Sequence, residues 1–209
     1  MTPRALPRRL LLPLVAVGAT ALVVLVVPVP GSLSVVATRS LAGLGADFAH
    51  IDLVSEVGLA TLALATAGAI VLSWLRHPER RLTTSVAALG VVVAYAASEA
   101  AKLLFAQARP CSRWAIAGDC PPAGDWSLPS NHATLAFGAL VVIAFAAGRA
   151  WIVWTGAALA TLVAAGRVAQ GVHYLHDVAL GAVFGLALPT ALVAIVVTSM
   201  QRVKRRTSR

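Results

Sequence analysis

The chain has 209 residues, of which 59% are hydrophobic and only 12% are charged. About a quarter of the residues of a water-soluble domain are charged, so the composition excludes a soluble globular protein and indicates an integral membrane protein. The formal net charge is +9. The positions of the basic residues, described below, account for this charge without a nucleic acid partner.

Six long windows free of charged residues run through the chain, and each can hold a membrane span of about 20 residues. They predict a single all-α membrane domain over residues 1–209, a bundle of six transmembrane helices, with approximate spans 10–29, 56–75, 82–104, 130–148, 150–166 and 177–199. The first span follows a basic segment that resembles a signal peptide, but we interpret it as a retained helix because it offers no convincing A-x-A cleavage site. Pro28 and Pro30 are expected to end it near the outer face.

The basic residues are distributed unequally between the two sides of this bundle. With a cytoplasmic N-terminus, twelve of the seventeen fall on the cytoplasmic side: Arg4, Arg8, Arg9, Arg76, Arg80, Arg81, Arg149, Arg202, Lys204, Arg205, Arg206 and Arg209. This positive-inside pattern predicts that both termini are cytoplasmic. The other five lie on the outer side against the rule, which makes them candidates for function: Arg39, Lys102, Arg109, Arg113 and Arg167.

The two cysteines, Cys111 and Cys120, fall in the outer connection between the third and fourth spans. Disulfides persist outside the cytoplasm, so the pair is predicted to be bridged. Two free thiols in a loop are the alternative.

The first polar cluster is "KLLFAQARP", residues 102–110. Lys102 and Arg109 are seven residues apart, so on a continuing helix they would share one face, about 10 Å apart along the axis. Pro110 is expected to stop that helix. The alternative is two snorkelling cations at a helix end, with Lys102 paired to Glu99.

The second cluster is "SLPSNHAT", residues 127–134, where the fourth span begins. Ser130 or Asn131 is placed to cap that helix, and the backbone N–H groups and positive end of a capped helix form an anion site. His132 would lie in the first turn beside the anion. Alternatively, His132 is only a polar residue at the level of the lipid headgroups.

The third cluster is "GRVAQGVHYLHD", residues 166–177, which contains the outer cation Arg167. On a helix, His173 and Asp177 would face each other four residues apart, so the carboxylate would accept the proton of one ring nitrogen and leave the other nitrogen bare. A histidine prepared in this way is a nucleophile or a base. His176 is given a supporting or interfacial role. All three clusters fall on the outer side, where a phosphate would meet three cations and two histidines.

These clusters, in this order, resemble the motifs of the type 2 phosphatidic acid phosphatases, a family of membrane lipid phosphatases with related acid phosphatases and haloperoxidases. The family pattern is K-x6-R-P, P-S-G-H and S-R-x5-H-x3-D, which is matched here by Lys102, Arg109, Pro110, Pro129, Ser130, His132, Arg167, His173 and Asp177. There are two departures from the pattern, Asn131 in place of glycine and Gly166 in place of serine.

The resemblance implies a role for each matched residue. His173 would attack phosphorus and form a phosphohistidine, Asp177 would orient it, and His132 would protonate the leaving oxygen and later activate water. The phosphate oxygens would be held by Lys102, Arg109, Ser130, Arg167 and the backbone N–H of Asn131. The Asn131 side chain is expected to narrow or rewire the pocket, and Gly166 to weaken phosphate binding modestly. The scheme requires no metal and no cofactor.

The resemblance also implies the setting: a multi-pass protein of the inner or plasma membrane that hydrolyses a membrane lipid phosphate on the extracytoplasmic side. Among family substrates we favour undecaprenyl (polyprenyl) diphosphate, with phosphatidylglycerol phosphate and phosphatidate as alternatives. Two other classes of function stay open. A zinc-dependent membrane hydrolase would use His132, His173, His176 and Asp177 as ligands, but leaves the cations unexplained. A non-catalytic anionic-lipid transporter would not need the pair of His173 and Asp177.

Overall fold

The computed structural model describes residues 6–25, 29–114 and 119–207. These residues form helices and connections and include no strand. The α-helices are α1 (Arg8–Val24), α2 (Leu33–Gly45), α3 (Ile51–Arg76), α4 (Arg81–Phe105), α5 (Asn131–Ala147), α6 (Ala150–Ala169) and α7 (Leu175–Thr207). Two short 3₁₀ turns, η1 (Pro78–Arg80) and η2 (Pro110–Ser112), flank α4.

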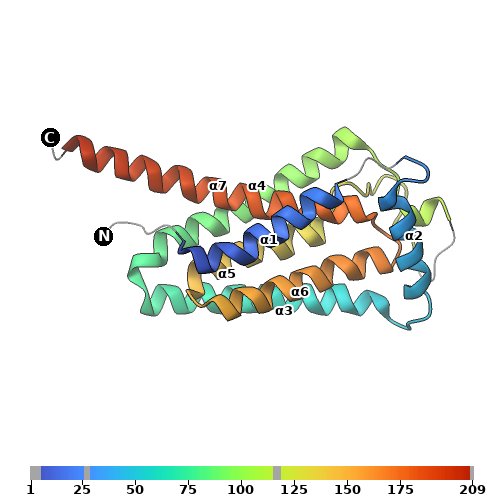
Figure 1. The fold of residues 1–209 in the computed structure, drawn as a ribbon, viewed down its shortest axis with the longest axis horizontal. Helices are drawn as coiled ribbons and strands as arrows, with labels where there is room; N and C mark the ends of the chain where they lie inside the picture. The colour runs from blue at the N-terminus through green and yellow to red at the C-terminus, as the bar shows by residue number, and fades with distance from the viewer. Residues whose placement is uncertain (1–5, 26–28, 115–118, 208–209) are drawn as a thin grey trace.

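Six of these helices, α1 and α3 to α7, overlap the six predicted spans. By length and apolar composition, the stretches able to cross a membrane are α3, α4 with its flanking turns, α6 and α7, whereas α5 is apolar but has only 17 residues. The start of α1 and the end of α7 lie at the same end of the bundle (Figure 1). Six membrane crossings and cytoplasmic termini stay predictions. Arg4, Pro28 and Arg209, which entered those predictions, lie outside the described residues.

Helix α2 is an addition to the predicted plan. It lies across the end of the bundle that is opposite to the start of α1 (Figure 1). Its first turn is capped by Ser32, whose hydroxyl accepts the N–H of Val35 at 3.3 Å. Ser34 and Thr38, both buried in α2, bind the start of α7, because the Ser34 hydroxyl accepts the N–H of His176 and the Thr38 hydroxyl accepts that of Leu175. Helix α2 therefore braces the segment that carries the third polar cluster.

The core of the bundle is α5, which packs against α3, α4, α6 and α7. Its side chains from Ala133 to Ala146 are almost all buried and mostly small or β-branched. A helix that is apolar on every face is covered either by lipid or by other helices, and α5 is covered by its neighbours. The start of α5 is consequently held in a fixed position relative to the ends of α4, α6 and α7.

Two glycines of α7 allow this helix to approach the start of α5 closely. A side-chain carbon added at Gly181 would collide with the carbonyl oxygen of Ser130, and one added at Gly185 would collide with that of Thr134. Small residues four apart let the backbones of two helices come close together in this way. The close approach lets the backbone N–H of Ser130 donate to the carbonyl oxygen of Asp177 at 3.1 Å, which joins the second polar cluster to the third.

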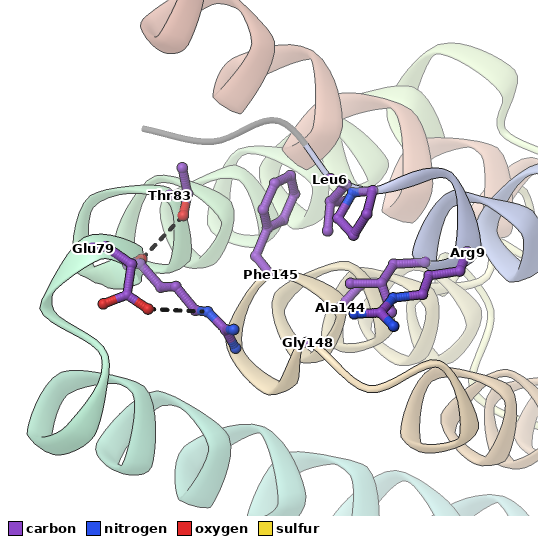
Figure 2. A pocket seen from close by; sticks show the side chains of 10 residues that line it. Leu6, Arg9, Glu79, Thr83, Ala144, Phe145 and Gly148 are labelled. Carbon is purple, nitrogen blue, oxygen red and sulfur yellow. Dashed lines mark hydrogen bonds and ion pairs between the residues drawn. The ribbon is translucent and has the colours of Figure 1, made fainter. Parts of the chain in front are cut away.

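The opposite end of α5 is fixed by the turn between α3 and α4. The Arg80 guanidinium donates to the carbonyl oxygen of Ala146 at 2.9 Å, where it complements the negative end of the α5 dipole. A pocket of about 290 Å³ adjoins this contact, and Figure 2 shows Glu79, Phe145 and Gly148 around it. At the start of α5, Ser98 of α4 donates to the side chain of Asn131 at 2.8 Å, so α5 is held near both of its ends.

Candidate active site

The predicted site residues come from four segments that meet at the end of the bundle crossed by α2. These segments are the end of α4, the loop that leads to α5, the start of α5, and the connection between α6 and α7 (Figure 1). Helices α3 and α2, which were not predicted to take part, add the side chains of Glu56 and Ser34 to the contacts described below.

The first cluster differs from its prediction. Helix α4 ends at Phe105, because Ala106 takes a left-handed conformation with φ of 42°, and Arg109 lies in extended chain before Pro110. The prediction that Lys102 and Arg109 share a face of one helix was therefore wrong. An extended conformation suits the residue before a proline, which is disfavoured in a helix.

Asp125, in the loop before α5, brings the two cations together instead. Its Oδ1 lies 2.9 Å from Nη2 of Arg109 and 3.9 Å from Nζ of Lys102. Its backbone carbonyl oxygen also accepts the Nε proton of Arg109 at 2.8 Å. The carboxylate of Asp125 therefore holds Lys102 and Arg109, which were predicted to bind phosphate, on the same side of the site.

Arg109 is buried and reaches His173 directly. Its Nη1 donates to the carbonyl oxygen of Val172 at 2.9 Å and lies 3.2 Å from Nε2 of His173. The guanidinium can only donate, so the Nε2 atom must present its lone pair. The geometry therefore defines which ring nitrogen of His173 is unprotonated.

The other ring nitrogen of His173 is held mainly by a backbone group. Nδ1 lies 2.8 Å from the carbonyl oxygen of Ser127, which can only accept, so the ring proton is on Nδ1. Asp177, the predicted partner, has its Oδ2 3.5 Å from the same nitrogen. The carbonyl oxygen of Ser127 is therefore a closer acceptor for the ring proton than the predicted partner Asp177.

Asp177 is fully buried and is itself fixed by donors. Its Oδ2 accepts the backbone N–H of Tyr174 at 2.7 Å, and its Oδ1 accepts from the amide of Gln107 at 2.7 Å. The carboxyl group of Asp177 is thus held in one position beside His173. Gln107 belongs to the first cluster, so this hydrogen bond links the first cluster to the third.

Burial lowers the pKa of His173 well below the ordinary value for histidine, and the nearby charges of Arg109, Arg167 and Lys102 lower it further. His173 lies in the connection between α6 and α7, outside the helices. Both causes disfavour the imidazolium ion. The ring is therefore neutral, with an available lone pair, at ordinary pH.

On the other side of the site, Glu56 of α3 joins His132 to Arg167. Its Oε1 lies 3.1 Å from Nε2 of His132 and 3.7 Å from Nη1 of Arg167. The exposed fraction of the Glu56 side chain is 56%, whereas those of His132 and Arg167 are 22% and 13%. Glu56 thus resembles Asp125, because one carboxylate oxygen of each contacts two groups that were predicted to act on phosphate.

Two polar atoms of the site are buried without a hydrogen-bond partner among the described residues: the hydroxyl oxygen of Ser130 and Nε of Arg167. Such groups are costly to bury unpaired. Ser130 stands at the N-terminus of α5 but does not cap the helix with its side chain. A phosphate bound at that helix end would supply the acceptor that both atoms lack.

Both departures from the motif pattern lie against neighbouring helices. The Asn131 side chain turns to α4, where it accepts a hydrogen bond from Ser98 at 2.8 Å and donates to Glu99. At Gly166, a side-chain carbon would meet Val54 and Ser55 of α3 at an ordinary contact distance of 3.4 Å. A serine there would accordingly point at α3.

His176 supports the site from behind. It is buried, its Nδ1 lies 2.7 Å from the Ser34 hydroxyl, and its Nε2 lies 3.2 Å from both Gln107 and Asp177. Its ring stacks on that of Tyr174, with 5.0 Å between centroids. Among the described residues, no three of the His, Cys, Asp and Glu side chains are grouped so as to hold a metal ion.

The loop after Arg109 is covalently closed by a disulfide between Cys111 and Cys120, whose Cα atoms are 5.6 Å apart. The backbone N–H of Cys111 donates to the carbonyl oxygen of Gly171 at 3.0 Å, which ties the loop to the connection that carries His173. A polar pocket of about 490 Å³ lies alongside, lined by Arg167, Gln170, Asp52 and Asp119 among others. It offers space for a head group next to the predicted phosphate site.

Comparison with known proteins gives consistent results. A family model described as the PAP2 superfamily matches residues 82–201. Over 145 residues the chain is 36% identical to the decaprenylphosphoryl-5-phosphoribose phosphatase of two strains of Mycobacterium tuberculosis, an alignment that covers 69% of this chain and 76% of the relative. The crystal structure of a transmembrane PAP2-type phosphatidylglycerolphosphate phosphatase from Bacillus subtilis matches with a TM-score of 0.51 and 18% identity, over 92% of this chain and 94% of that one. At that identity, the structural match concerns the fold alone.

Proposed function

Because the chain belongs to the PAP2 superfamily and is a phosphatase, we propose that it removes a phosphate group from a polyprenyl-linked lipid at the outer face of the membrane. The observation that carries the chemistry is the state of His173. Its Nδ1 proton is bound by Ser127, so the lone pair of Nε2 is directed at the Arg109 guanidinium. A neutral imidazole with a directed lone pair is an activated nucleophile.

In the proposed first step, Nε2 of His173 attacks phosphorus and the bond from phosphorus to the leaving oxygen breaks. His132 gives its proton to that oxygen, so the lipid product leaves as an alcohol or as a lower phosphate. In the second step, His132 takes a proton from water, the water oxygen attacks phosphorus, and the bond to His173 breaks. Inorganic phosphate is released and both histidines return to their starting states.

The cations act where negative charge accumulates. The phosphoryl oxygens take up charge in the transition state, and fixed donors stabilise it there. Arg109 and Lys102 approach from the side of Asp125, Arg167 from the side of Glu56, and Ser130 from the N-terminus of α5. The unpaired Ser130 hydroxyl and Arg167 Nε support this assignment, because both need an acceptor.

The proposed substrate class rests on the relative and on the surroundings of the site. The 36% identical relative acts, by its name, on a decaprenylphosphoryl-linked phosphoribose. We therefore favour a polyprenyl anchor over a diacylglycerol anchor, with either a diphosphate, as in undecaprenyl diphosphate, or a phosphorylated sugar as the head group. The pocket of about 490 Å³ beside Arg167 has space for the larger of these two.

The experiment offers purified protein in detergent four substrates side by side: undecaprenyl diphosphate, a polyprenylphosphoryl phosphopentose, phosphatidylglycerol phosphate and phosphatidate. Phosphate release is measured, and the labelled enzyme intermediate is trapped under conditions that preserve phosphohistidine. We expect a polyprenyl substrate to give the highest kcat/KM, and the His173→Gln variant to lose both turnover and label. Preference for a diacylglycerol substrate would overturn the substrate assignment.

Two further outcomes would overturn the mechanism. Phosphate release by His173→Gln at the wild-type rate would exclude His173 as the nucleophile. Substrate binding without phosphate release or label would instead indicate a non-catalytic lipid binder. His77→Gln is the matched control, because His77 follows α3 at the far end of the bundle, where its Nδ1 lies 3.3 Å from Glu79.

A further inference from the structure

We propose that Asn131, where the family motif has glycine, is a positioning residue that holds Lys102 in place through Glu99. The proposal rests on the proposed function only in assigning Lys102 to phosphate binding. It explains why asparagine can replace the glycine of the family motif at position 131, because both polar atoms of its side chain bind residues of α4.

The orientation of the Asn131 amide is determined by its two partners. The hydroxyl of Ser98 donates to Oδ1 at 2.8 Å, and Nδ2 donates to Oε1 of Glu99. Ser98 is fully buried, so its bond fixes the amide from the core side. With Oδ1 committed to Ser98, the amide must present its N–H₂ group to Glu99, since a carboxylate can only accept.

The same oxygen of Glu99 pairs with Lys102. Oε1 of Glu99 lies 3.2 Å from Nζ of Lys102, one helical turn further along α4. The Glu99 side chain is 48% exposed, so a pair formed with lysine alone would be loosely ordered and weak. The Asn131 amide provides the second bond that keeps the carboxylate, and with it the lysine, in one place.

The ordered lysine extends this chain of contacts into the phosphate site. Nζ of Lys102 lies 3.9 Å from Oδ1 of Asp125, which binds Arg109 at 2.9 Å. The start of α5 is thereby connected to both cations of the first motif. A glycine at position 131 has no side chain to reach α4, so it would leave Glu99 without this donor.

The test is a double-mutant cycle of Asn131→Gly and Glu99→Ala, read out as KM for a lipid phosphate and as the inhibition constant of orthovanadate, a phosphate analogue. We expect Asn131→Gly to raise KM and the inhibition constant about five- to tenfold, which lies in the range of one ordinary hydrogen bond. In the Glu99→Ala background the glycine should change neither value further. An equal effect in both backgrounds, or none in the wild-type background, would overturn the proposal.

Asn131→Asp separates hydrogen bonding from packing. This variant keeps the shape of the side chain and the bond from Ser98, but it places a carboxylate against Glu99, so it should raise both values at least as much as glycine. Wild-type values for Asn131→Asp would show that only packing matters, which contradicts the proposal. The variants should fold, because the family pattern itself has glycine here, and Tm is measured for each.

Thr155→Ala is the matched control, since Thr155 bonds only within α6, to the carbonyl oxygen of Trp151. It should leave KM and vanadate inhibition unchanged. The phosphohistidine trap on the wild-type protein separates the two proposals. Absence of label would refute the proposed function, whereas label with an additive cycle would refute only the role of Asn131.

Discussion

The carbonyl oxygen of Ser127 and Nδ1 of His173 lie 2.8 Å apart, and this contact decides the state of the predicted nucleophile. A backbone oxygen cannot take a different protonation state, so it accepts the ring proton over the whole range of working pH. Ser127 is held in turn by Gln107, whose backbone carbonyl oxygen accepts the Ser127 N–H at 2.9 Å. The proton on His173 is thus placed by the loop between α4 and α5.

The lowered pKa of His173 predicts that its ring is neutral at pH 6.5, where about half of an ordinary histidine with a pKa of about 6.5 is charged. Nitrogen-15 NMR of histidine-labelled protein, assigned with His173→Gln, should show a protonated Nδ1 and a bare Nε2 at that pH. An imidazolium signal for His173 at that pH would contradict the geometry.

The same pKa shift has a consequence for stability. Below about pH 6.5 the unfolded ring binds a proton that the folded ring does not, so the free energy of unfolding should decrease as the pH falls through this range. Thermal unfolding of wild type and His173→Gln between pH 7.5 and 5 checks the sign. The variant lacks the titrating ring and should lose less stability than wild type over the interval.

Replacing Asp177 with asparagine should impair catalysis less than replacing His173, because Ser127 still holds the ring proton. Replacement of the carboxyl oxygen that lies 3.5 Å from the ring nitrogen is expected to cost about 1.5–3 kcal/mol, or roughly 10- to 150-fold in kcat. Single-turnover rates for Asp177→Asn and His173→Gln provide the comparison. Equal losses in the two variants would indicate that Asp177, and not Ser127, is the principal partner.

Glu56→Gln should bind inorganic phosphate and orthovanadate more tightly than wild type. The Glu56 carboxylate pairs with His132 and Arg167, so an incoming anion must replace it and is repelled by it. Because Glu56 is more than half exposed, we expect only about a three- to tenfold fall in the inhibition constant. Glu79→Gln, in the turn before α4 at the far end of the bundle, is the control and should leave inhibition unchanged. Weaker anion binding in Glu56→Gln would show that the carboxylate assists binding.

Gly181→Ala tests whether the close approach of α7 to α5 builds the site. The added methyl group would press on the carbonyl oxygen of Ser130, at a cost of about 1–3 kcal/mol in stability, and should lower kcat as well. Gly68→Ala in α3 is the control, because nothing lies within 4 Å of the added carbon. Unchanged activity in a destabilised Gly181→Ala protein would separate packing from catalysis.

Removal of divalent metal should leave turnover unchanged. The scheme relies on side-chain cations to neutralise the phosphoryl oxygens, so dialysis against EDTA is expected to have no effect on kcat. Loss of activity that zinc or magnesium restores would contradict it.

Most of the helices could be predicted from the sequence, but helix α2 could not. The apolar windows gave six of the seven helices found in the described residues, because span length depends on local composition. Helix α2 was missed because its 13 residues are too few to span a membrane and include the charged Arg39, so it does not stand out as a charge-free window.

In the site, motif spacing predicted contacts between residues that are close together in the sequence, such as His173 and Asp177. It could not identify Asp125 and Glu56, because a lone carboxylate in a loop or on a helix has no periodic signal and its partners lie far away in the chain. Ser127 acts through its backbone, which leaves no trace in residue type. The helix assumed to join Lys102 to Arg109 failed because a left-handed Ala106 cannot be read from an alanine.

The disulfide between Cys111 and Cys120 also provides a chemical measurement of the orientation of the chain in the membrane. Thiols in the cytosol are kept reduced. A molecule with this loop in the cytosol would therefore carry two cysteines that react with maleimide. A molecule in the predicted orientation would carry none until its disulfide is reduced. A single gel of maleimide-treated membranes would therefore count inverted molecules, without a tag, a protease or an antibody.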